Sequence, residues 1–315
     1  MRLSTKILRN QIKLLKPIIT GCSIETARAA QDKLGKLMMA VRGKALEHSR
    51  VSFPSFEAAF LRLREASSAG VILYLHGGGY VAGDLDYAKG FGSVLAEESG
   101  MRVFCPAYRL APEFPFPAAL EDAEEAYRFL LQSGYDAASI ALIGESAGGG
   151  LVYALTLRLK RHALPLPACI VALSPWSDLT QQGDSYEENA KKDPSMTKER
   201  LDFFAEQYIP SSENPVNPYI SPVYGDLAGI PPSRIYVGGS EVMRDDAAAL
   251  YDRLINCGCS VSLSIRPGMW HAYVLYGTEE GKEDLQELIG FIKERTNERT
   301  GKQHNVKMDA AGQCR

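Results

Sequence analysis

The heptapeptide GESAGGG, at residues 144–150, places a serine among small residues between two apolar runs. Gly144, Ser146 and Gly148 form the pattern G-x-S-x-G on a predicted turn from a strand into a helix. A side chain at either glycine would crowd the neighbouring strand and helix, and the sharp turn exposes the serine hydroxyl. The backbone N–H of Ala147 and the helix N-terminus are expected to point to the same place. The pattern predicts a nucleophilic serine, although a tight packing turn with a spectator serine would use the same glycines.

A second glycine run, HGGG at residues 76–79, follows another apolar segment. Consecutive glycines allow close backbone approach and leave N–H groups available. Such a loop supplies donors of an oxyanion hole, which stabilises the negative charge of a tetrahedral intermediate. A phosphate-binding loop would need the pattern G-x-x-x-x-G-K-[ST], which this sequence lacks. The two glycine motifs together favour acyl-transfer chemistry at Ser146.

A serine hydroxyl requires a base before it can act as a nucleophile. The chain has five histidines, and His271 is the one that follows the last predicted strand, as the chain order Ser, acid, His requires. The others lie in the N-terminal region, in the glycine loop, at the end of a helix and in the C-terminal tail: His48, His76, His162 and His304. A histidine on a surface loop is the alternative interpretation of His271.

The third member of such a site is a carboxylate that fixes the imidazole tautomer and stabilises the charged imidazole. It should follow the preceding strand, which has the sequence RIYVGG. Glu241 comes directly off the end of that strand. Asp245 and Asp246 lie a turn later, where they could cap or open a helix instead. The residues alone leave these three candidates open.

Predicted strands alternate with predicted helices along most of the chain. The strands are expected within residues 51–65, 70–80, 101–109, 139–145, 168–176, 233–241 and 260–273. The helices are expected at residues 5–16 (ended by Pro17), 24–46, 117–134, 147–162, 246–258 and 283–296. This order predicts a mostly parallel sheet with helices on both faces, and a site beyond the carboxyl ends of the strands.

Two segments interrupt the alternation and could cover the strand ends as a helical cap. These are residues 1–50 and an insertion at about residues 181–210 within the main domain, residues 51–296. The polar, aperiodic residues 297–315 are predicted to be a disordered tail. Aromatic residues near the cap could line an apolar substrate pocket, although such residues are more often plain core: Tyr80, Phe203, Phe204 and Tyr208.

Composition limits the classes of partner. The chain has 315 residues and a formal net charge of −3, which argues against nucleic acid or an anionic membrane as partner. No run reaches the length of a membrane span. The six cysteines, including the pair Cys257 and Cys259, are expected to be reduced in a cytoplasmic protein.

These motifs resemble the hormone-sensitive-lipase-like esterases, bacterial family IV of the α/β-hydrolase superfamily. The similarity covers about residues 70–292. It is carried in order by HGGGY, YRLAPEFPFPAALED (residues 108–122), GESAGG, SPWSDL (residues 174–179) and NPYISP (residues 217–222). Glu145 stands where the family usually has aspartate.

The resemblance implies an α/β-hydrolase fold and assigns roles to residues. The family acid opens a D-P-L-x-D segment 30 residues before the histidine, and counting back from His271 gives Glu241. Glu241 is therefore favoured over Asp245, although the proline is missing and glutamate replaces aspartate. By the same matching, Gly78, Gly79 and Ala147 are the oxyanion donors.

The implied activity is a carboxylesterase acting on small-molecule esters with short-to-medium acyl chains. Ser146, His271 and Glu241 would form the catalytic triad, with no cofactor or metal. Lactones or acetyl esters at the same site are alternatives, and a non-catalytic small-molecule receptor on the same fold is a more distant one. A homodimer is also compatible with the sequence.

Overall fold

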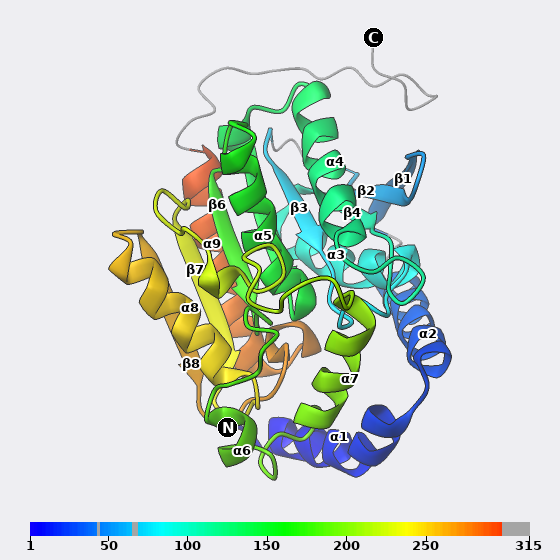
Figure 1. The fold of residues 1–315 in the computed structure, drawn as a ribbon. Helices are drawn as coiled ribbons and strands as arrows, with labels where there is room; N and C mark the ends of the chain where they lie inside the picture. The colour runs from blue at the N-terminus through cyan, green and yellow to red at the C-terminus, as the bar shows by residue number, and fades with distance from the viewer. Residues whose placement is uncertain (43–44, 65–68, 298–315) are drawn as a thin grey trace.

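The computed structural model describes residues 1–42, 45–64 and 69–297. Within these residues the strands form a single sheet in the order β1-β2-β4-β3-β5-β6-β7-β8 (Figure 1). The strands are β1 (Leu46–Ser52), β2 (Glu57–Leu63), β3 (Val71–Leu75), β4 (Arg102–Ala107), β5 (Ile140–Glu145), β6 (Cys169–Leu173), β7 (Ser233–Gly238) and β8 (Val261–Arg266). β2 is antiparallel to both β1 and β4, and the other neighbours pair in parallel. The prediction of a mostly parallel sheet is confirmed.

Helices cover both faces of the sheet (Figure 1). One face carries α4 (Ala118–Gln132), α5 (Ala147–Arg161) and α8 (Arg244–Asn256), and the other carries α3 (Leu85–Ser99) and α9 (Glu279–Asn297). Successive residues of the central strand β3 serve the two layers in turn. Leu73 and Leu75 join the core of the first face, and Ile72 and Tyr74 join the core of the second. Burial on both faces explains why β3 reads as an uninterrupted apolar run.

The cap contains α1 (Leu3–Gly21) and α2 (Ile24–Arg42) from the N-terminus, with α6 (Ser185–Glu188) and α7 (Lys198–Tyr208) from the predicted insertion. α2 lies directly on α3. A Cβ added to Gly35 would be 2.2 Å from the carbonyl oxygen of Asp86, and one added to Gly90 would be 2.7 Å from the Cα of Gly35. Arg28 also donates hydrogen bonds to the carbonyls of Val81 (2.7 Å) and Ala111 (2.9 Å). Helix α2 is therefore held against the main domain by close packing on α3 and by the hydrogen bonds of Arg28.

Several predicted boundaries are wrong. α1 continues through Pro17 to Gly21, so this proline removes one N–H from the backbone ladder without ending the helix. α2 ends at Arg42, and β1 begins at Leu46, inside the segment predicted to be helical. The predicted tail, from residue 298 onward, lies outside the described residues.

Helix α3 was not predicted as an element. Its sequence, LDYAKGFGSVLAEES, contains two glycines and is buried along most of its length, so it lacks the one-sided apolar stripe that marks a surface helix. The glycines serve packing. Gly90 meets α2 as described above, and a Cβ on Gly92 would be 2.4 Å from the Sγ of Cys105.

The structure also gives information on membrane spans, cysteines and metal-binding groups. No helix among the described residues is long and apolar enough to cross a membrane. The five cysteines in this part of the chain are free thiols, Cys257 and Cys259 among them. Across residues 1–42, 45–64 and 69–297, His, Cys, Asp and Glu side chains form no group of three that could hold a metal ion.

Candidate active site

Ser146 occupies the sharp turn between β5 and α5. Its backbone angles, φ 54° and ψ −122°, are rare for a residue with a side chain, and such strain costs on the order of 1–3 kcal/mol. Close packing of the backbone enforces the turn. A Cβ on Gly144 would be 2.0 Å from the carbonyl oxygen of Gly148, and one on Gly148 would be 2.0 Å from that of Leu75. The N–H of Ser146 is fixed by donating to the carbonyl of Leu173 (2.9 Å). The glycines at 144 and 148 are therefore required by space.

The glycine loop follows β3 and lies against the turn. Gly78 and Gly79 have φ values of 117° and 64°, a region that residues with a Cβ rarely adopt. Next to them, a Cβ on Gly77 would be 3.0 Å from the Cβ of Ser146. The two motifs that the sequence places far apart are thus in contact.

Glu145 joins these two motifs. Its buried carboxylate accepts hydrogen bonds from the N–H of Gly77 (3.1 Å) and from the hydroxyls of Tyr74 and Tyr87 (3.0 Å each). Burial raises the pKa of Glu145, and these three donors act to lower it. The sequence marked Glu145 only as a variant of the motif. The structure shows that it positions the glycine loop.

His76 packs inside the glycine loop. Its ring stacks on that of Tyr108 at 4.2 Å, and Nδ1 lies 2.7 Å from the carbonyl oxygen of Gly77. Burial lowers the pKa of His76 to about 4, so the ring is neutral near pH 7. These contacts are those of a residue that orders the loop.

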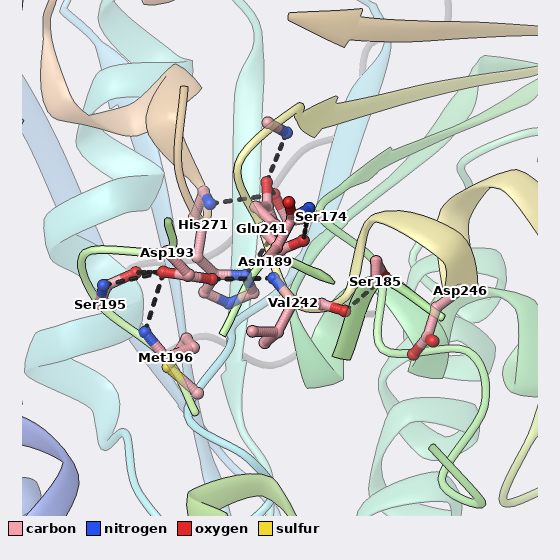
Figure 2. A network of polar contacts seen from close by, with 12 residues as sticks. Ser174, Ser185, Asn189, Asp193, Ser195, Met196, Glu241, Val242, Asp246 and His271 are labelled. Atoms are coloured by element: carbon pink, nitrogen blue, oxygen red, sulfur yellow. Dashed lines mark hydrogen bonds and ion pairs between the residues drawn. The ribbon is translucent and has the colours of Figure 1, made fainter. Parts of the chain in front are cut away.

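His271 and Glu241 form a pair at the carboxyl ends of β7 and β8 (Figure 2). Nδ1 of His271 lies 3.0 Å from Oε2 of Glu241, whose side chain is completely buried. Oε1 of Glu241 accepts hydrogen bonds from the hydroxyl of Ser174 (2.6 Å) and the N–H of Gly238 (2.5 Å). Both carboxylate oxygens are therefore bonded, and the acid is held in one orientation.

Burial and the acid act on the pKa of His271 in opposite directions. Burial lowers it, whereas the hydrogen bond and the negative charge of Glu241 raise it. The net result is a pKa above the ordinary value of an imidazole. Since a carboxylate at Nδ1 favours the tautomer with its proton there, Nε2 remains unprotonated and can act as a base.

The two other candidate acids have different partners. Asp245 bonds the guanidinium of Arg244 (2.8 Å) and the N–H of Ser185 (2.8 Å). Asp246 accepts from the hydroxyl of Tyr186 (2.9 Å), and burial raises its pKa well above the usual range. Of the three carboxylates, Glu241 is the one that the structure places against His271.

The loop after β6 connects the serine turn to the acid. Leu173 accepts the N–H of Ser146, and the N–H of Trp176 donates to the carbonyl of Ser146 (2.9 Å). Between them, the hydroxyl of Ser174 bonds Glu241 and accepts the N–H of Ala272 (2.9 Å). Ser174 was missed as a functional residue, although the sequence SPWSDL around it was one of the motifs of the resemblance.

Two further residues come from the cap insertion and were also missed. Asn189 donates through Nδ2 to the carbonyl of Glu241 (2.8 Å), and Oδ2 of Asp193 accepts the N–H of Val242 (3.0 Å) (Figure 2). Oδ1 of Asp193 accepts three more hydrogen bonds, from the N–H and hydroxyl of Ser195 and from the N–H of Met196. The insertion thus fixes the loop that carries the acid.

The residues predicted to line a substrate pocket lie in different environments. Tyr80 and Tyr208 are buried in the core, with rings stacked 3.8 Å apart, as the plain-core alternative expects. Phe204 covers the glycine loop, since a Cβ on Gly79 would be 2.3 Å from its ring. Phe203 lines a hollow of about 610 Å³ between the end of α1 and the start of α7.

A family model described as the alpha/beta hydrolase fold matches residues 72–275. The chain therefore belongs to this family. This assignment agrees with the sheet order, the turn at Ser146 and the helical cap.

The chain is also similar to individual hydrolases and esterases. The chain is 38% identical to an acetyl-hydrolase from Streptomyces hygroscopicus over 229 residues, covering 72% of this chain and 76% of the relative. It is 28% identical to the putative acetyl-hydrolase LipR of Mycobacterium tuberculosis over 309 residues, covering 97% and 99%. Among solved structures, EstE7, a hormone-sensitive-lipase homologue from a metagenome library, has 35% identity and a TM-score of 0.84, covering 91% of this chain and 98% of its own. The resemblance to hormone-sensitive-lipase-like bacterial esterases is confirmed.

Proposed function

We propose that this protein hydrolyses small carboxylic esters through a triad of Ser146, His271 and Glu241. The observation that carries the proposal is the buried pair of His271 and Glu241, tied by the loop after β6 to the backbone of Ser146. A buried acid at Nδ1 leaves Nε2 as the base for a serine hydroxyl.

The reaction divides into two steps. The Oγ of Ser146 attacks the ester carbonyl while Nε2 of His271 takes its proton, and His271 then returns that proton to the departing alcohol. Water attacks the resulting acyl-enzyme by the same route and releases the acid. Glu241 stabilises the imidazolium that forms in both steps. The N–H groups of Gly78, Gly79 and Ala147 are proposed to bind the oxyanion, replacing water with fixed dipoles.

The relatives support ester hydrolysis. Their names include an acetyl-hydrolase from Streptomyces hygroscopicus, an ethyl acetate hydrolase from Pseudomonas putida and a carboxylesterase from Mycobacterium tuberculosis. The chain is a hydrolase of the carboxylesterase class. We propose small esters with short-to-medium acyl chains as substrates, with lactones and acetyl esters as alternatives at the same site.

The test is the hydrolysis of p-nitrophenyl acetate and butyrate by wild type and Ser146→Ala. We expect a loss of at least about 10³-fold in kcat, since nucleophile and base act as a unit. Ser93→Ala is the matched control, because Ser93 is also buried but lies on α3, where its hydroxyl donates to the carbonyl of Gly90 (2.6 Å). A fluorophosphonate probe should label wild type and not Ser146→Ala. Equal rates for wild type and Ser146→Ala would end the proposal.

A further inference from the structure

A hollow of about 690 Å³ lies between the cap helices and the body of the protein. We call it the cap trough. α2 forms one side with Leu34, Leu37 and Val41, α3 forms the floor with Phe91 and Val94, and the other side belongs to α9 and the 3₁₀ turn η3 (Tyr273–Tyr276). Most of the surface that lines it is apolar, so it is suited to a hydrocarbon ligand.

Part of the cap trough lies beside the candidate active site. Oε1 of Gln31, which lines the trough, would be 3.2 Å from a Cβ on Gly78. This oxygen is buried and has no hydrogen-bond partner among the described residues. Tyr276, on the opposite wall, packs its ring edge-on against Trp270, the residue before His271 (centroids 5.6 Å apart). The trough therefore passes beside the glycine loop and the histidine loop, and it continues past Gln31 to Thr26 of α2 and Cys22.

The part of the trough that leads away from the glycine loop can be measured along α2. Gln31 and Val41 are ten residues apart, which at the helical rise of 1.5 Å per residue is about 15 Å. An extended hydrocarbon advances about 1.25 Å per carbon, given tetrahedral carbons and a C–C bond near 1.5 Å, so this distance fits about twelve carbons. The far end is polar, with Arg42 and Glu98 among the lining residues. Both the length and the polar end suit a linear chain of limited size.

The exposure of the walls supports a ligand of this kind. Leu34, Leu37 and Val41 are 44%, 62% and 73% exposed, although all three are large apolar residues on one face of a helix. Single exposed leucines are ordinary, but a contiguous apolar surface inside a hollow marks a binding site. Each methylene group that leaves water for such a surface strengthens binding by about fourfold.

We propose that the cap trough binds the linear alkyl chain of a medium- to long-chain ester whose carbonyl carbon lies at Ser146. This inference rests on the proposed ester hydrolysis and names its substrate class more narrowly. It extends the chain length beyond the short-to-medium range that the family resemblance implies. The chain could belong to the acyl or to the alcohol part of the ester, and the two are distinguished by experiment.

The experiment compares kcat/KM for p-nitrophenyl butyrate, p-nitrophenyl dodecanoate and dodecyl acetate, each kept below its micelle-forming concentration. The blocking variant is Leu34→Trp, which places an indole across the trough at a half-exposed site where folding should tolerate it. The control is Leu14→Trp, at a position on α1 that is 80% exposed and does not line the trough. We expect Leu34→Trp to lower kcat/KM at least tenfold for one of the two dodecyl substrates and less than twofold for butyrate. The affected substrate identifies the part of the ester that the trough holds.

The inference is overturned if Leu34→Trp lowers kcat/KM equally for all three substrates or leaves kcat/KM for both dodecyl substrates unchanged. It is also overturned if Leu14→Trp has the same effect as Leu34→Trp. A second measurement does not need turnover. Ser146→Ala should bind dodecanoate in calorimetry, and the double variant with Leu34→Trp should bind it at least tenfold more weakly. Equal binding by both would count against the trough. If wild type fails to hydrolyse even butyrate while this difference in binding is present, the proposed function fails and the trough remains a lipid-chain site.

Discussion

The candidate site has two sides that differ in polarity: the acid side, around Glu241, and the cap side, formed by the cap trough. On the acid side, both oxygens of Glu241 are bonded and its side chain has no contact with solvent. On the cap side, the α2 wall of the trough is apolar and exposed, and the amide oxygen of Gln31 has no partner among the described residues. Several polar contacts thus hold the acid of the proposed triad in one orientation, whereas the trough that would bind the substrate is apolar and accessible.

The two sides are nevertheless joined through the cap insertion. Nζ of Lys16, on α1, donates to the carbonyls of Ala190 (3.0 Å) and Asp193 (2.7 Å). The side chain of Asp193 in turn holds the N–H of Val242, next to the acid. A continuous path of contacts therefore runs from the N-terminal cap to Glu241. Variants placed along this path should have smaller effects with increasing distance from the acid.

The largest effect is expected at the acid itself. Glu241→Gln keeps the shape of the side chain but removes the charge that stabilises imidazolium, so kcat should fall by about 10³-fold or more. Asp245→Asn, the control, should leave kcat within about tenfold of wild type, because Asp245 bonds Arg244 and Ser185 and not His271. Steady-state kinetics on p-nitrophenyl butyrate measure both. If only Asp245→Asn abolished turnover, Glu241 would be the wrong acid.

The pH dependence sharpens the same comparison. Activity requires neutral His271, so kcat/KM should rise with pH through the pKa of this residue. Glu241 raises that pKa by hydrogen bond and charge. Its removal should lower the pKa, and the acid limb of the profile of Glu241→Gln should move to lower pH. An unchanged limb would mean that Glu241 does not act on the base.

The sequence could predict features that depend on local contacts better than features that depend on contacts between distant residues. The turn at Ser146 depends on local contacts. Gly144 and Gly148 are required by backbone contacts within a few residues or with the adjacent strand, so their spacing in the sequence is informative. Periodicity could not choose between Glu241 and Asp245, because it does not give the direction of each side chain, and Glu241 was favoured only through the family resemblance. Asn189 and Asp193 act across about 50 residues of sequence, in a segment without regular pattern.

Packing accounts for the other failures of prediction. α3 was missed because its glycines, which weaken a helical pattern, are required where it meets α2 and Cys105. Tyr80 and Tyr208 resembled pocket residues because large aromatic side chains suit both a core and a pocket. The cap trough could not be predicted, because it is formed by helices whose contacts are distant in sequence.

An intermediate effect is expected for substitution of Asp193, whose side chain links the N-terminal cap to the residue next to the acid. Asp193→Asn replaces a carboxylate that accepts four hydrogen bonds with an amide that can accept through one oxygen only. The N–H of Val242 or the donors around Ser195 then lose their partner, and we expect a loss of about 1–3 kcal/mol in stability and about tenfold in kcat. Denaturant unfolding and kinetics measure the two. Asp184→Asn, at an exposed site of the same insertion with no side-chain cap bond, should change neither.

The smallest effect is expected at the start of the path, in the N-terminal cap. Lys16→Met preserves the aliphatic stem but removes the two hydrogen bonds to the insertion. Burial lowers the pKa of Lys16, so part of the benefit of these bonds is already offset by lost hydration. We therefore expect a loss of only about 1 kcal/mol, or about 2–4 °C in Tm, and a two- to threefold fall in kcat. Lys13→Met, on an exposed face of the same helix, is the matched control and should leave both unchanged. If Lys16→Met reduced kcat as strongly as Asp193→Asn, the cap would control the acid directly, and the separation between a hydrogen-bonded acid side and an apolar substrate side would not hold.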